Sequence, residues 1–129
     1  MDVLGIDPGL ERIGYGVVRR EGSKLTCLAQ GLIQTPRIAT PDRLVMIFDE
    51  VGRILEAYKP DAAATEKLFY AKNQTTVIDV AKAIGVVHLA LGRFGLRPVE
   101  LSPPCLLYTS ITHACQALED VPPLNACPK

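Results

Sequence analysis

The chain has 129 residues, of which 48% are hydrophobic and 22% are charged, with 14 basic and 14 acidic side chains. This composition excludes a disordered tail, which would have fewer apolar residues and more net charge, and it fits one globular domain. A membrane-spanning helix needs roughly 18 apolar residues, and charged residues interrupt every apolar run of this chain before that length. The N-terminus has no signal-peptide pattern. We therefore expect a cytoplasmic protein without membrane contact.

The first 34 residues predict three strands. Residues 3–6 form a short apolar run that ends in the turn-forming sequence Asp-Pro-Gly at residues 7–9. A second strand is expected at 14–18, and a hairpin turn at 20–23 leads into a third strand at about 24–34. Three successive strands joined by short turns predict an antiparallel meander.

Two helices and two more strands follow. Thr40 and Pro41 predict the start of a helix, with the threonine as its cap. A second helix is expected at 75–92, and because it is apolar nearly all round, we expect the sheet and a second subunit to cover it. Strands are expected at 62–66 and 97–101. The order β-β-β-α-β-α-β predicts a mixed α/β sheet. The core face of the first helix is expected to carry Leu44, Ile47, Phe48, Val51, Leu55 and Tyr58.

The composition changes after Ser102. Residues 1–102 contain 25 charged side chains, whereas residues 103–129 contain three, together with five of the ten prolines and three of the four cysteines. The cysteine spacing has no C-x-x-C pair, which favours free thiols over a metal site or a disulfide framework. We therefore expect a domain at 1–103 and an atypical tail at 104–129 that is not native to the fold.

Two carboxylates follow apolar strands directly. Asp7 ends the first predicted strand and Glu66 ends the fourth, and a carboxylate at such a position needs a partner. Two carboxylates from neighbouring strands would suit Mg²⁺. The alternative is structural, in which Asp7 caps its turn and Glu66 pairs with a lysine such as Lys67.

Three short sequences give this pair a context. They are Gly-Ile-Asp-Pro-Gly at 5–9, Gly-Tyr-Gly at 14–16 and Glu-Lys-Leu-Phe-Tyr-Ala-Lys-Asn at 66–73. Together they resemble the RuvC-type Holliday-junction resolvases of bacteria, over residues 1 to about 103. The resemblance implies a ribonuclease H-like fold, a homodimer, and Mg²⁺-dependent cutting of four-way junction DNA that leaves 5′-phosphates during recombination and repair. It also implies an association with a branch-migration helicase complex.

The resemblance assigns roles to Asp7, Glu66 and Phe69. Asp7 and Glu66 match two of the family's four metal ligands and are the expected catalytic residues. Phe69 matches an aromatic wedge that stacks on a base near the crossover. Tyr70, Lys72 and Asn73 are expected to contact DNA beside it. A core position under the loop is the alternative for the phenylalanine. A basic stretch from Lys67 to Arg97 is either a DNA-binding face or a solvated helix surface.

The chain departs from the family after the last predicted strand. The family has a final helix with two more metal ligands three residues apart, which this chain lacks, and its remaining carboxylates, Glu119 and Asp120, are adjacent. We therefore expect a truncated or frame-shifted resolvase with weak or no cleavage. The alternatives are a non-catalytic junction-binding module and half of a sugar-kinase-like or actin-like ATPase.

Overall fold

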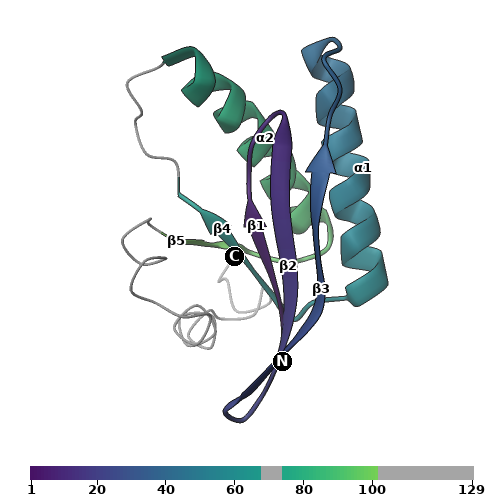
Figure 1. Cartoon of the computed structure of the whole chain (residues 1–129), viewed down its shortest axis with the longest axis vertical. Helices are drawn as coiled ribbons and strands as arrows, with labels where there is room; N and C mark the ends of the chain where they lie inside the picture. The colour runs from purple at the N-terminus through teal and green to yellow at the C-terminus, as the bar shows by residue number, and fades with distance from the viewer. Residues whose placement is uncertain (68–73, 102–129) are drawn as a thin grey trace, which may run out of the picture.

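The computed structural model describes residues 1–67 and 74–101, with the backbone alone at 74–76. Seven elements follow one another along these residues (Figure 1). They are β1 (Asp2–Asp7), β2 (Arg12–Glu21), β3 (Lys24–Gln34), α1 (Thr40–Tyr58), β4 (Ala62–Glu66), α2 (Gln74–Arg93) and β5 (Val99–Leu101). The predicted order of elements is confirmed. The tail at 104–129 lies outside the described residues, as does any helix after β5.

One five-stranded sheet has the order β3-β2-β1-β4-β5. The first three strands are antiparallel, whereas β4 is parallel both to β1 and to β5, so the sheet has an antiparallel half and a parallel half. The hairpin between β2 and β3 turns through two residues, and Gly22 takes the positive φ of 60° that such a turn needs at its first position. The alanine-rich segment at 62–66, which helix propensity would favour as a helix, is an interior strand as predicted.

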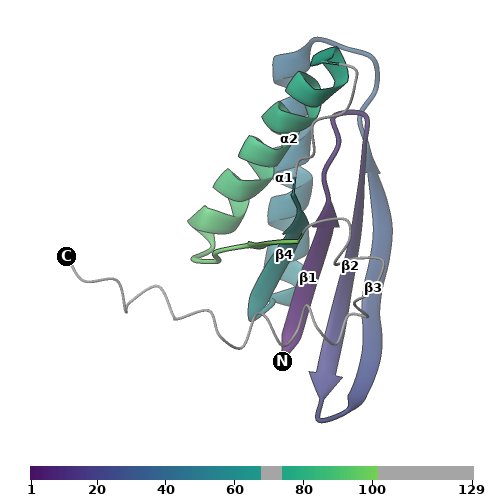
Figure 2. The same cartoon turned by 90° about the vertical axis from the view of Figure 1, so that its left-hand side faces the viewer.

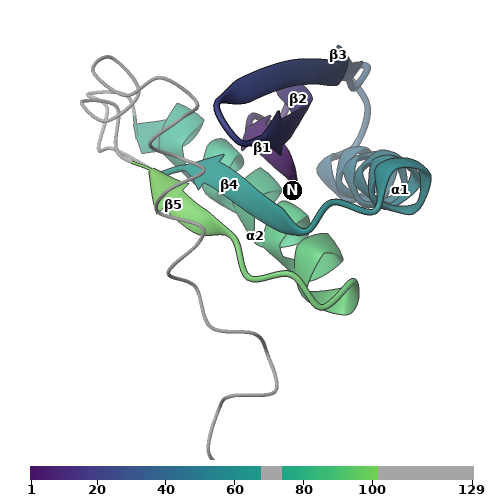
Figure 3. The ribbon, with the colours of Figure 1, turned by 90° about the horizontal axis from the view of Figure 1, so that it is seen from below.

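Both helices cover the same face of the sheet (Figures 2 and 3). Alternate residues of the strands point toward them, including Leu4 and Ile6 of β1 and Ala63 of β4, and the helices supply the other half of the core. Among the described residues, the largest fully buried side chains are Leu4, Ile13, Val17, Ile47, Val51, Leu55, Thr65, Val87 and Leu91. The opposite face of the sheet is therefore the one on which Val3 packs with Ala62 and Val99.

Two expectations about α1 are wrong. Thr40 is already helical and the cap is Ala39, whose carbonyl oxygen accepts hydrogen bonds from the backbone N–H groups of Asp42 and Arg43. These donors need no threonine hydroxyl, because the backbone already satisfies them. Tyr58 is 37% exposed at the helix end, since the buried face is completed by Ile54 instead.

An acidic and basic cluster fixes the start of the sheet. Asp2 of β1 accepts two hydrogen bonds of 2.7 Å from the guanidinium of Arg19 on β2, and its backbone N–H donates to Asp61 Oδ2 at 2.7 Å just before β4. The hydrogen bonds from Arg19 lower the pKa of the Asp2 carboxyl. This cluster ties three neighbouring strands together at the end of the sheet opposite to Asp7.

Candidate active site

Asp7 and Glu66 end neighbouring parallel strands. Ile6 of β1 lies opposite Thr65 of β4 in the parallel register, so the next residue of each strand reaches the same edge of the sheet. Both side chains lie on the face away from the helices, because their strand neighbours Ile6 and Thr65 are buried on the helix side. The two carboxylates that the sequence singled out are therefore brought together.

The surroundings of Glu66, including Asp7, favour the protonated form of its carboxyl. Partial burial raises the pKa of Glu66, and a hydrogen bond with Asp7 raises it further, since a protonated Glu66 carboxyl can donate to the Asp7 carboxylate. The negative charge of Asp7 acts in the same direction. Two carboxylates that favour a shared proton also favour a shared cation, because either one relieves their repulsion.

Small residues lie next to the carboxylates on this face. Gly14 of β2 lies directly opposite Asp7, and a Cβ atom placed on this glycine would lie 3.7 Å from the Asp7 Cβ. Gly5 and Ala64 come two residues before the two carboxylates on their strands. On the Asp7 side the described neighbours on this face are therefore small, whereas Leu101 of β5 pairs with Glu66 on the other side.

A polar link that the sequence analysis missed lies beneath the site. Thr65, which is 2% exposed, has its hydroxyl 3.2 Å from Nε2 of His88 on α2. The same ring nitrogen lies 3.9 Å from Glu100 Oε1 on β5. Helix α2 is thus joined to the strand that carries Glu66 one residue later. The residues next to Thr65 and His88 in the sequence give no sign of this contact, because the two positions are 23 residues apart.

The donor set fits a magnesium ion only in part. Mg²⁺ is commonly held by one or two carboxylates, with waters and phosphate oxygens completing its coordination, and Asp7 with Glu66 matches that requirement. Within residues 1–67 and 74–101, no cluster of three or more His, Cys, Asp or Glu side chains is placed to hold a metal. The described residues contain no ion pair between Glu66 and Lys67, which is one form of the structural alternative for Glu66.

The expected DNA-contacting residues Phe69, Tyr70, Lys72 and Asn73 lie outside the described residues, so their roles stay predictions. The structure describes four residues of the basic stretch, namely Lys67, Lys82, Arg93 and Arg97, and the choice between a DNA-binding face and a solvated helix surface stays a prediction. Among its described members, Lys82 pairs with Asp79 on α2 at 3.2 Å. Arg93 and Arg97 lie at the end of α2 farthest from Glu66, since the helix returns from the carboxyl end of β4 to the start of β5 (Figure 2).

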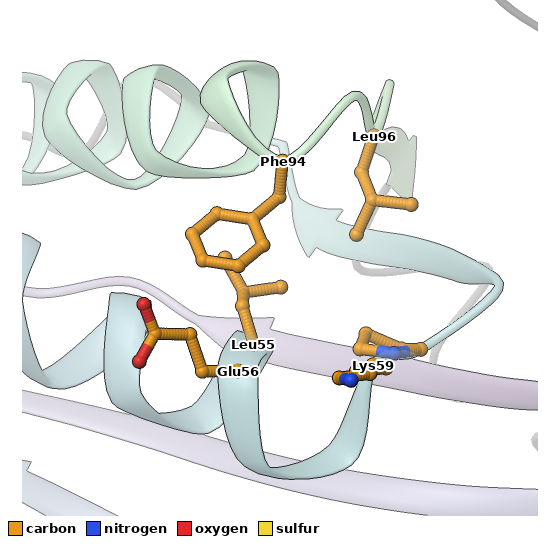
Figure 4. Close-up of a pocket in the computed structure, with 6 residues that line it drawn as sticks. Leu55, Glu56, Lys59, Phe94 and Leu96 are labelled. Carbon is orange, nitrogen blue, oxygen red and sulfur yellow. The ribbon is translucent and has the colours of Figure 1, made fainter.

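A pocket of about 310 Å³ lies at this far end, between the last turns of α1 and α2 (Figure 4). Leu55, Pro60, Phe94 and Leu96 give it an apolar lining, with Glu56 and Lys59 at its side. The pocket is separated from the carboxylates by the length of the helices, so it is not part of the candidate site.

Comparison with known proteins identifies the family. The model of the family described as crossover junction endodeoxyribonuclease RuvC matches residues 3–117. The chain belongs to the RuvC family. A RuvC protein of Treponema denticola is 42% identical over 102 residues, which cover 78% of this chain and 57% of that protein. One of Brevibacillus brevis is 44% identical over 104 residues, covering 80% of this chain and 63% of that protein.

The RuvC fold is confirmed by solved structures. The structure of T. thermophilus RuvC in complex with a Holliday junction substrate superposes with a TM-score of 0.76 at 30% identity, covering 81% of this chain and 67% of that one. The yeast mitochondrial Holliday junction resolvase, with a TM-score of 0.60 and 20% identity, shares the fold. The expected ribonuclease H-like architecture is thus correct.

The extent of the match is also informative. The chain spans about three fifths of the length of the curated RuvC relatives named above. The family match runs beyond residue 103, where the resemblance read from the motifs ends, and a domain boundary at that residue stays a prediction.

Among the described residues, no helix is both long enough and apolar enough to cross a bilayer.

Proposed function

We propose that this chain carries the core of a divalent-metal-dependent endonuclease that resolves four-way DNA junctions in the cytoplasm by paired nicks leaving 5′-phosphates. The observation that carries the proposal is the convergence of Asp7 and Glu66 at one sheet edge in a member of the RuvC family. Junction DNA is the expected substrate because a T. thermophilus relative was solved in complex with a Holliday junction.

Asp7 and Glu66 would hold Mg²⁺ beside the phosphodiester that is cut. The bound metal supplies charge neutralisation at the phosphate and a more acidic water as nucleophile. Asp7 and Glu66 would be the residues that hold the ion, and Gly14 opposite Asp7 would leave space beside it for the DNA backbone. Phe69, Tyr70, Lys72 and Asn73, which begin three residues after Glu66, would form a stacking and phosphate-binding platform next to the site.

A homodimer is part of this proposal, because two nicks in a symmetric junction need two sites. The outer surface of α2 supports it. Ile78 is 56% exposed and Leu89 is 59% exposed, and Lys82 and Gly85 lie exposed between them at helical spacing. Two large exposed apolar side chains on one helix face, with Lys82 between them, favour this face as a dimer surface. A branch-migration helicase complex would be the further partner.

A non-catalytic junction-binding module is the second candidate function. It is favoured by the donor set, because the described residues provide only two carboxylates where the family resemblance implies four ligands. The chain after Leu101 contains two more carboxylates, Glu119 and Asp120, and their adjacency differs from the three-residue spacing of the family. We therefore expect the 129-residue chain to bind metal weakly and to nick slowly.

The test is nicking of a synthetic four-way junction by the 129-residue chain, over a range of Mg²⁺ concentrations, with Asp7→Asn as the matched inactive variant. Slow paired nicks that disappear in EDTA and in Asp7→Asn support the endonuclease. Junction binding that weakens steeply from about 50 to 200 mM salt, without nicks at any Mg²⁺ concentration, supports the binding module instead. Failure to bind a four-way junction more tightly than a linear duplex would contradict both.

A further inference from the structure

Arg12 at the start of β2 lies on the same face of the sheet as the two carboxylates. Gly14 pairs directly with Asp7 and shares its face, and Arg12 comes two residues earlier on the same uninterrupted strand. The residue between them, Ile13, is 1% exposed and packs under the helices. Because side chains alternate along a strand, the guanidinium of Arg12 projects from the carboxylate face.

The turn from Asp7 to Arg12 is held in one shape. A Cβ atom on Gly9 would lie 2.4 Å from the backbone oxygen of Arg12, so the chain folds back tightly on itself and only glycine fits there. The tight turn fixes where β2 begins relative to the end of β1. The separation of Arg12 from Asp7 is therefore set by the backbone and does not depend on a flexible loop.

Side chains outside the turn anchor it from below. Thr35 donates its hydroxyl proton to the carbonyl oxygen of Leu10 at 2.6 Å, and its backbone N–H donates to the carbonyl oxygen of Glu11 at 3.1 Å. Arg43 of α1 donates from Nε to Thr35 Oγ1 at 2.8 Å and from Nη2 to Leu10 O at 3.3 Å. The start of β2 is thus tied to the first turn of α1.

Within residues 1–67 and 74–101, Arg12 has no polar side-chain partner. It is exposed and makes no hydrogen bond or ion pair within the described part of the chain, whereas the adjacent Glu11 lies 3.9 Å from Arg37. A guanidinium offers a planar pair of donors that fits phosphate oxygens. Arg12 lies on the carboxylate face but is not ion-paired with either carboxylate. Its N–H donors are therefore available to a phosphate of the DNA that binds at the metal site.

We propose that Arg12 binds a backbone phosphate of the DNA strand that enters the Asp7 and Glu66 site, as a positioning residue. This inference rests on the proposed function. Two residues of a strand span about 7 Å. Phosphates of one duplex strand are spaced at about 3.4 Å of axial rise, so the phosphate bound by Arg12 lies within about two nucleotides of the phosphodiester over the carboxylates. Such a contact fixes the position of the strand without reading its sequence.

The experiment measures junction affinity by fluorescence anisotropy in EDTA, where no strand is cut, at several salt concentrations between about 50 and 200 mM. Arg12→Gln is compared with Arg93→Gln, which removes the same charge from an exposed residue at the far end of α2. We expect Arg12→Gln to weaken binding roughly five- to tenfold at low salt and to reduce the slope of log K against log[salt] by about one. Arg12→Lys should restore the slope and only part of the affinity.

The outcomes separate this inference from the proposed function. If the wild-type chain binds the junction and Arg12→Gln matches it in affinity and slope, the role of Arg12 is refuted while the proposed function stands. An equal loss in Arg93→Gln would also refute it, since it would indicate a general charge effect. If the wild-type chain binds no junction, both proposals fail. Circular dichroism and thermal midpoints establish that the variants are folded, which we expect because both side chains are exposed.

Discussion

The hydrogen bond between Thr65 and His88 makes a sharp test of how burial sets the cost of losing a polar partner. The Thr65 hydroxyl is enclosed, since the residue is 2% exposed, whereas the side chain of His88 is 30% exposed. Removing the histidine with His88→Leu leaves a buried hydroxyl without a partner. Removing the hydroxyl with Thr65→Val leaves an imidazole that water can reach.

The two costs should therefore differ. An unsatisfied buried hydroxyl costs about 1–3 kcal/mol, so we expect His88→Leu to lower the free energy of unfolding by about 2 kcal/mol. Thr65→Val keeps the shape and should cost only about 0.5–1 kcal/mol. In the double variant both groups are apolar, so its loss should be smaller than the sum of the single losses by about 1 kcal/mol or more.

The assay is urea unfolding followed by circular dichroism, with all variants measured at the same pH. Thr26→Val is the matched control, because Thr26 is exposed on β3 and its hydroxyl can be replaced at a cost within about 0.5 kcal/mol. Equal losses for Thr65→Val and His88→Leu, or strictly additive losses in the double variant, would refute the reasoning from burial.

Two further predictions concern the candidate site and the proposed dimer. The raised pKa of Glu66 means that stability is lost as pH rises through that pKa, so in EDTA Glu66→Gln should be more stable than wild type at neutral pH. The difference should vanish below the ordinary carboxyl pKa of about 4, and thermal melts that show no gain at neutral pH would contradict the interaction with Asp7. Leu89→Glu should give a monomer in light scattering. Val45→Glu, at an equally exposed apolar residue of α1, should leave the dimer intact. An unchanged molecular mass for Leu89→Glu would show that this face of α2 is not the dimer interface.

The elements of the fold were readable because their signals are local. Turn residues and alternation located the three-stranded meander, with the third strand at 24–34 found as expected. Helical spacing located both helices to within a residue at each end. The Thr40 cap failed for a local reason too, since the Ala39 carbonyl oxygen already accepts the hydrogen bonds that the hydroxyl was expected to replace.

For the candidate site too, local features could be predicted from the sequence and non-local contacts could not. That Asp7 and Glu66 end apolar strands could be predicted from local patterns, because a charged residue after such a run is visible in a single segment. Their meeting at one sheet edge could not, because the parallel register of β1 and β4 joins segments about 60 residues apart. The contact of Thr65 with His88 and the place of Arg12 on the carboxylate face were decided in the same way, since strand pairing and helix packing are non-local and leave no mark on the residues near them in sequence.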